Sequence, residues 1–178
     1  MIAEIQPSFS SHLSMSRKIE YQLSKIKEGN GKVLCTSTGD ELAAMPTYMK
    51  LISRLNDRVK LPYAEFILSL YPGESLSNEQ WISLTGEYIE RMGYGKSCYA
   101  VVLNTDKAHS HVHVLLTTID EEGKSIPAGN NYSRSEKISR ELELKYGLLP
   151  LERVGGKKIA LGESQYRSYY FDVALKKA

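Results

Sequence analysis

The chain has 178 residues and a formal net charge of +2, and 25% of its residues are charged. This length suits one domain with a sizeable core, and no apolar run approaches the roughly 20 residues that a membrane span needs. No secretory signal is visible, and Cys35 and Cys98 lack metal-type spacing, so we expect a cytoplasmic protein with two free thiols.

The first predicted elements are a short strand at residues 2–5 and a helix at residues 10–27. Within the helix, Ile19, Leu23 and Ile26 recur at helical spacing. These three apolar residues form the predicted buried stripe, because residues four and seven apart lie on one face of a helix.

Tyr21 lies outside that stripe. Arg17 stands four residues before it and Lys25 four residues after it, so the three share one predicted helix face. A tyrosine flanked by two cations is either an ordinary surface residue or a phenol presented to a phosphate group. The spacing leaves both interpretations open.

The next stretch predicts a strand at residues 33–38 and a helix that begins at Asp40 or near Pro46. Residues 63–71 then alternate as a strand, with apolar residues along one face. Glu65 is a carboxylate in the middle of this apolar run. A charge in that position needs a partner.

Residues 77–92 predict a helix, and two strands at residues 98–104 and 111–119 follow it as a hairpin. The second strand carries His111 and His113. Residues two apart on a strand project from one face, about 7 Å apart at Cα, so the two imidazoles are able to converge on one ion. A pair of core or exposed histidines without function is the alternative interpretation.

A capping-box spacing at residues 133–136 begins a further helix that ends near residue 146, and a last helix is expected at residues 167–177. This order of elements predicts an α/β sandwich. Its single sheet would have about five largely antiparallel strands, with helices packed mainly on one face.

Charge is unevenly distributed along the chain. Residues 1–60 carry nine Lys and Arg against six Asp and Glu, residues 61–123 carry three against nine, and residues 124–178 carry eleven against six. Basic flanks fit a phosphate backbone and an acidic middle fits carboxylates around a cation, although solvated surfaces often show similar segregation. Residues 1–178 are interpreted as one domain, with a core of about residues 1–150 and a basic C-terminal extension at 151–178.

Several spaced segments carry a family resemblance. Asp106, His111 and His113 follow the pattern Asp-(x4)-His-x-His before a hydrophobic run, with Asn104 two residues ahead of the aspartate. Further matching segments lie at residues 69–74, 93–95 and 140–148. Together they resemble the mobilization relaxases of the MobA/MobL type, P or Q class, which belong to the HUH endonuclease superfamily. In the third motif of that family a histidine usually stands where this chain has Asn104.

The resemblance implies a palm-like, ferredoxin-related core and a divalent cation, Mg²⁺ or Mn²⁺, with Zn²⁺ or Ni²⁺ also admitted by imidazole ligands. His111, His113 and Asn104 are the implied ligands, because a hard cation accepts an amide oxygen. Glu65 is implied to be a base or a partner of a ligand histidine, and Asp106 to fix a histidine tautomer or the hairpin turn.

The implied activity is nicking of single-stranded or hairpin DNA at the transfer origin of a plasmid or mobile element. Tyr21 is the residue that fits the place of the nucleophile in the first motif, and its attack on a phosphodiester would form a 5′-phosphotyrosyl link. Accessory mobilization proteins are implied partners. The cations expected to contact DNA phosphates are Arg17, Lys25, Lys107, Arg134 and Lys137.

Two other functions remain open from the sequence. Another HUH enzyme, a replication initiator or a single-strand transposase, would use a tyrosine after the histidine motif, here Tyr132 or Tyr146. A non-catalytic module that binds single-stranded nucleic acid would need neither Tyr21 nor a metal ion.

Overall fold

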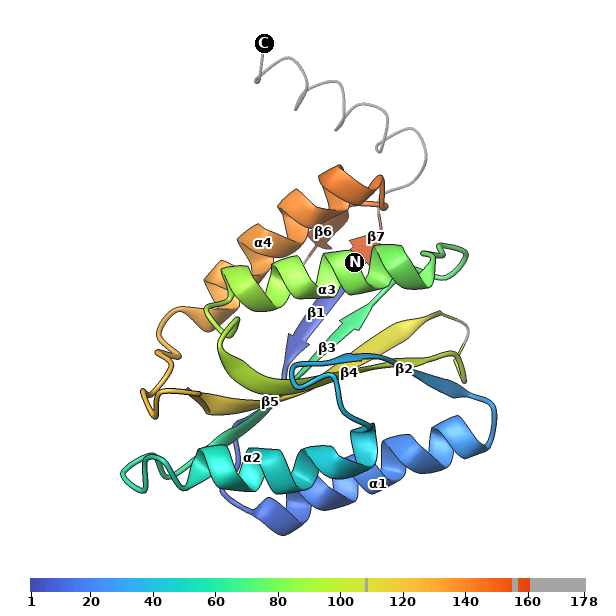
Figure 1. Cartoon of the computed structure of the whole chain (residues 1–178). Coiled ribbons are helices and arrows are strands. Elements are labelled where there is room, and N and C mark those ends of the chain that lie inside the picture. The colour runs from blue at the N-terminus through green and yellow to red at the C-terminus, as the bar shows by residue number, and fades with distance from the viewer. Residues whose placement is uncertain (108, 155–156, 161–178) are drawn as a thin grey trace.

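Five strands form one antiparallel sheet in the order β1-β3-β5-β4-β2 (Figure 1). The computed structural model describes residues 1–107, 109–154 and 157–160. The strands are β1 (Ile2–Ile5), β2 (Gly31–Thr36), β3 (Tyr63–Ser69), β4 (Ser97–Asn104) and β5 (His111–Asp120). All five lie close to their predicted places, and the α/β sandwich with a five-stranded sheet is confirmed.

The helices cover both faces of this sheet, so the expectation that they pack mainly on one face is wrong. The helices α1 (His12–Lys27) and α2 (Met45–Ser53), with the short 3-10 helix η1 (Leu42–Ala44), lie on one face. The helices α3 (Asn78–Arg91) and α4 (Asn131–Tyr146) lie on the other (Figure 1). The physical reason is that the central strands bury apolar side chains on both sides, and each apolar face needs a covering layer.

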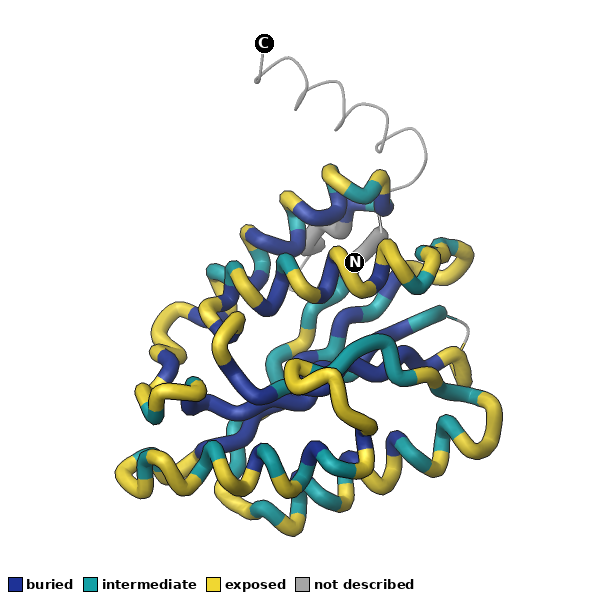
Figure 2. Tube along the Cα trace, viewed as in Figure 1, coloured by how far each residue is buried: buried dark blue, intermediate teal, exposed yellow. Residues whose placement is uncertain are grey.

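Two hydrophobic clusters follow from this layering. The larger one lies between the sheet and α3 and α4, and it includes Phe66, Val112 and Val114. The smaller one lies between the sheet and α1 and α2, and it includes Ile19 and Leu115. Buried residues accordingly run along the sheet while exposed residues mark the outer sides of the helices (Figure 2).

Helix ends show where local sequence signals succeed and fail. Ser77 caps α3 with a capping box, as its sequence predicts. In contrast, the N-cap of α4 is Asn130, three residues before Ser133, the N-cap that the predicted capping box implies. Asn130 adopts a left-handed conformation with φ 56°, and its side chain makes no capping hydrogen bond.

The C-terminal part contains a small hairpin of β6 (Leu151–Val154) and β7 (Lys157–Ala160), which the weak sequence pattern did not predict. The helix expected at residues 167–177 lies outside the described residues. Among the helices of the described part, none is both long and apolar enough to cross a membrane.

Candidate active site

The hairpin of β4 and β5 places the two histidines as the sequence predicts. His111 and His113 lie on the face of the sheet that α1 covers, with ring centroids 5.3 Å apart, and Asn104 pairs with His111 across the hairpin. His111 is buried and His113 is half-buried. Burial, and then the nearby charge of His113, lower the pKa of His111, which favours the neutral imidazole that ligates metals.

Glu65 reaches His113 from the neighbouring strand β3. Its Oε1 accepts a hydrogen bond from His113 Nδ1 at 2.7 Å, and its Oε2 forms an ion pair with Lys18 of α1. Burial raises the pKa of Glu65, but the hydrogen bonds from His113 and Lys18 outweigh it and hold the pKa below its usual value. The carboxylate predicted to need a partner therefore has two.

Tyr21 faces the same site from α1. Its side chain is 54% exposed, away from the buried side of the helix, as predicted. A pocket of about 400 Å³ lies between α1 and the strands β3 and β5, with one lining residue from the segment just after β1. The pocket is lined by Gln6, Arg17, Lys18, Tyr21, Gln22, Glu65, Ile67 and His113. The structure thus brings Tyr21, Glu65 and His113 together, although they are far apart in the sequence.

Lys25 connects Tyr21 to the hairpin turn. Its Nζ lies 5.5 Å from the centre of the Tyr21 ring and 3.3 Å from Asp106 Oδ2. Burial raises the pKa of Asp106, but the hydrogen bond from Lys25 prevails and lowers it overall. Asp106 Oδ1 is 4.0 Å from His111 Nε2, too far for a direct hydrogen bond that would fix the histidine tautomer.

Asn104 is buried beside His111, but its amide oxygen does not take the orientation expected of a metal ligand. Its Nδ2 donates a 2.9 Å hydrogen bond to Gln22 Oε1. Its Oδ1 is buried without a hydrogen-bond partner and lies 3.0 Å from the position that a Cβ on Gly31 would take. Asn104 lies on β4, which has β5 on one side and β2 on the other. Gly31 is the residue of β2 that pairs with Asn104, so the amide oxygen lies over β2 and away from the histidines of β5.

The two histidines offer at most two imidazole nitrogens to a cation. The Nδ1 of His113 is engaged by Glu65, and the Nδ1 of His111 lies 3.5 Å from the carbonyl oxygen of His109, so both rings can present Nε2. Across the described ranges, no three His, Cys, Asp or Glu side chains are grouped so as to hold a metal ion.

Other residues predicted for the site lie elsewhere. Arg134 and Lys137 belong to α4, across the sheet from the histidines, and Arg134 hydrogen-bonds Pro127 and Asn131 there. Tyr132 and Tyr146, the alternative nucleophiles, are also on α4. Of the predicted cations, Arg17 lines the pocket, Lys25 contacts Tyr21, and Lys107 is near enough to His111 for its charge to lower the pKa of His111.

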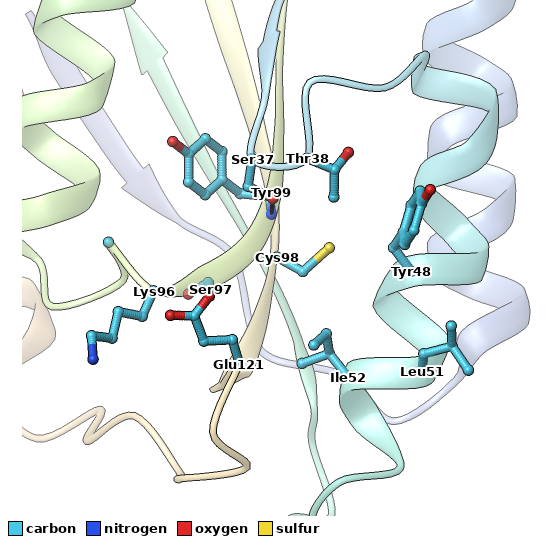
Figure 3. A pocket seen from close by; sticks show the side chains of 11 residues that line it. Ser37, Thr38, Tyr48, Leu51, Ile52, Lys96, Ser97, Cys98, Tyr99 and Glu121 are labelled. Carbon is cyan, nitrogen blue, oxygen red and sulfur yellow. Dashed lines mark hydrogen bonds between the residues drawn. The ribbon is translucent and has the colours of Figure 1, made fainter.

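A second pocket of about 350 Å³ lies at the opposite end of β4. Tyr48 and Ile52 of α2 stand on one side and Tyr99 of β4 on the other, with Cys98 between them (Figure 3). None of the residues predicted for the site lines it. Cys98 is a buried free thiol whose pKa burial raises, as expected of a structural cysteine.

Four residues that line the pocket were not predicted, Gln6, Lys18, Gln22 and Ile67, and two of them, Lys18 and Gln22, hold side chains of the site in place. Lys18 stands three residues before Tyr21, next to it on the helix, and this spacing was the available signal. Gln22 is buried with 2% exposure on an otherwise apolar side of α1. Their partners, Glu65 and Asn104, are 47 and 82 residues away, so only the folded sheet reveals the pairs.

Comparison with known proteins assigns the family. The solved structure described as "Molecular Basis of Vancomycin Resistance Transfer in Staphylococcus aureus" shares 16% identity with this chain at a TM-score of 0.50, covering 89% of this chain and 100% of that chain, which is a likeness of fold. No curated protein matches. The model of the MobA/VirD2-like relaxase nuclease domain matches residues 21–148, well over half of the chain. The protein therefore belongs to the MobA/VirD2-like relaxases, and this chain carries their DNA-cleaving nuclease domain.

Proposed function

We propose that this relaxase nicks one strand of DNA at a transfer origin, with Tyr21 as the nucleophile, and so initiates mobilization of a plasmid or other mobile element. One observation carries the proposal: Tyr21 shares a pocket with Glu65 and His113, whereas Tyr132 and Tyr146 lie across the sheet on α4. The arrangement favours the relaxase order of nucleophile before histidines over the transposase order.

His111 and His113 would hold a divalent cation through their Nε2 atoms. When bound, such an ion supplies positive charge at the non-bridging oxygens of the scissile phosphate and polarises phosphorus. Phosphate and water oxygens suit Mg²⁺ or Mn²⁺, and the imidazoles also admit Zn²⁺ or Ni²⁺. Both oxygens of Glu65 are engaged, which favours a role in orienting His113 over a role as the general base.

The covalent step exchanges one phosphoester bond for another. The Tyr21 oxygen attacks phosphorus in line, the bond from phosphorus to the 3′ oxygen breaks, and a 5′-phosphotyrosyl link and a free 3′-hydroxyl result. The phenol proton leaves to solvent, which reaches the exposed Tyr21, and the 3′ oxygen takes up a proton as it departs. The Lys25 ammonium is placed to offset negative charge on the tyrosine, while Asp106 holds Lys25 in position.

The DNA would approach as a single strand or as a hairpin with a single-stranded extension. Arg17, which lines the pocket with His113, and Lys107, whose charge acts on His111, would contact phosphates of the strand. Because the phosphotyrosyl link conserves the energy of the phosphodiester, rejoining of the strand needs no nucleotide cofactor.

The test is a covalent adduct on one tyrosine. Wild-type protein, a divalent cation and a single-stranded oligonucleotide that carries its nick site should give a shifted band on a denaturing gel. Tyr21→Phe removes only the hydroxyl from an exposed side chain, so it should fold and bind DNA but form no adduct. Tyr132→Phe, an exposed tyrosine on α4, is the matched control and should form the adduct at the wild-type rate.

Mass spectrometry of the digested adduct should find the nucleotide on Tyr21. A full-strength adduct in Tyr21→Phe, or a modified Tyr132 or Tyr146, would refute the assignment. Binding of DNA without any adduct in the wild type would instead support the non-catalytic alternative.

A further inference from the structure

The site presents two imidazole nitrogens, and both oxygens of the nearest carboxylate, Glu65, are already occupied. Glu65 uses one oxygen for His113 and the other for Lys18. Asp106 uses Oδ2 for Lys25, and its Oδ1 lies 4.0 Å from His111 Nε2 without a hydrogen bond to it. No cluster of three His, Cys, Asp or Glu is formed by the residues that the structure describes. A protein with two ligands in place binds a free divalent cation weakly, because the ion must keep most of its water shell.

Asn104, which occupies the place of the family's usual histidine, does not supply the third ligand in this arrangement. The hydrogen bond from Nδ2 to Gln22 Oε1 fixes the orientation of the amide. The remaining oxygen then lies over Gly31, on the side of β2. Gln22 and Asn104 are both almost fully buried, so neither side chain can turn without displacing the packing between α1 and the sheet.

A hard divalent cation bound by two histidines fills its remaining coordination positions with water or with phosphate oxygens. Mg²⁺ demands near-octahedral geometry, dehydrates reluctantly, and is commonly held by only one or two protein side chains, usually carboxylates, together with substrate phosphates. Imidazole is also an accepted ligand of divalent transition metals. Two imidazoles leave about four positions for water and for the non-bridging oxygens of a DNA phosphate. The open pocket beside His113 gives a phosphate access to these positions.

We infer that His111 and His113 hold the cation firmly only together with a DNA phosphate, so that DNA and metal are recruited jointly rather than in sequence. The inference rests on the proposed function and specifies how its metal site is filled. Two ligands that complete each other's binding are coupled, and the coupling is reciprocal: DNA must raise the affinity for metal by the same factor by which metal raises the affinity for DNA.

The experiment uses Mn²⁺ as the probe and the Tyr21→Phe protein, which binds without turnover. The fraction of free Mn²⁺ is measured by electron paramagnetic resonance with protein alone and with protein plus a single-stranded oligonucleotide. DNA binds Mn²⁺ by itself, so the triple variant Tyr21→Phe, His111→Ala, His113→Ala with the same oligonucleotide gives the background. DNA should tighten specific Mn²⁺ binding at least about fivefold, and Mn²⁺ should tighten DNA binding by the same factor.

Variants at the neighbouring residues test the ligand count in the absence of DNA. Asn104→Ala should leave Mn²⁺ binding by the free protein unchanged. Asn104→His supplies a third imidazole, as in other relaxases, and should raise that affinity about tenfold or more while the coupling to DNA shrinks. Asp106→Asn should change the affinity of the free protein by less than twofold.

The outcomes separate this inference from the proposed function. Equal Mn²⁺ affinity with and without DNA, lost in the histidine variant, would overturn joint recruitment and leave the metal site standing. Tenfold weaker binding by free Asn104→Ala or Asp106→Asn would identify a third protein ligand and also overturn it. No specific Mn²⁺ binding under any condition would overturn the metal assignment itself, while the Tyr21 adduct would still test the nucleophile.

Discussion

The two faces of the central sheet are built from the same strands but bury different chemistry. Toward α3 and α4, Phe66, Leu68, Val112 and Val114 are all fully buried and apolar. Toward α1 and α2, the apolar cluster occupies one end of the strands, and the polar groups of the site occupy the other. Alternation along β3 and β5 thus separates a packed core on one face from the polar, pocket-lining residues of the candidate site on the other.

The difference shows how a small domain accommodates buried polar groups. A buried charge or amide is costly unless it is hydrogen-bonded, and one helix, α1, supplies the partners. Lys18 binds the buried Glu65 and Gln22 binds the buried Asn104, while Lys25 pairs with the exposed Asp106 at the edge of the site. The apolar face can then provide most of the stability, so changes to the two faces are expected to have separable effects.

The largest effect is expected on the face that carries the candidate site. His111→Ala combined with His113→Ala removes both imidazole nitrogens and should lower metal-dependent nicking on the order of 10³-fold or more, the scale of losing a key charge-stabilising group. Unfolding by denaturant should show a stable, cooperative protein. Nicking at the wild-type rate by this variant would contradict the site.

A substitution on the face toward α3 and α4 should have the opposite result, a loss of stability with activity retained. Leu116 is fully buried in the larger cluster, so Leu116→Ala should lower the free energy of unfolding by about 2–5 kcal/mol, measured by denaturant titration. Nicking per folded molecule should stay near the wild-type rate. Leu115→Ala is the matched control: Leu115 faces the other way and pairs with Glu65, so this variant should lose both stability and activity. If both variants lost stability and activity to the same extent, the two faces would not have separate roles in stability and in nicking.

Lys25→Met should have a smaller effect, because it removes the charge beside Tyr21 but keeps a long side chain. We expect nicking to slow by about tenfold, which corresponds to about 1.4 kcal/mol in the barrier. Lys27→Met, in the exposed last turn of the same helix, is the control and should slow nicking by less than twofold. A tenfold loss in both variants would indicate a general loss of DNA attraction in place of a specific role for Lys25.

The smallest effect concerns pH. The folded-state pKa of Glu65 is held below its ordinary value of 4.5, so its charge contributes stability that is fully present above that pH and is lost as the pH falls through the lowered pKa. With metal chelated, the difference in unfolding free energy between wild type and Glu65→Gln should therefore be largest near neutrality and shrink below pH 4.5. A difference that grows on acidification would contradict the pairing with His113 and Lys18.

The sequence predicted the parts of the molecule that depend on local pattern. The alternation in β3 and β5 predicted which residues share a face, and the position of Tyr21 off the apolar stripe predicted its exposure. Contacts between distant segments could not be read in this way. The amide of Asn104 was expected to turn toward the metal site, but its orientation depends on Gln22, 82 residues away, and on the missing side chain of Gly31. Arg134 was likewise grouped with the site by charge, whereas the layering places α4 on the other face.

The register of β5 has a consequence for how this domain tolerates insertions and deletions. His111 pairs with Ser69 on one side and Asn104 on the other, and each following residue alternates in direction. One residue added within the strand would exchange the two sets of side chains, driving imidazoles into the apolar layer under α3 and α4 and turning valines toward α1. One residue added in the turn between β4 and β5 would leave the alternation of side chains along β5 unchanged. It would displace only the turn residues, Asp106 among them. Length variation among viable relatives should accordingly accumulate in the turn and be absent from the strand.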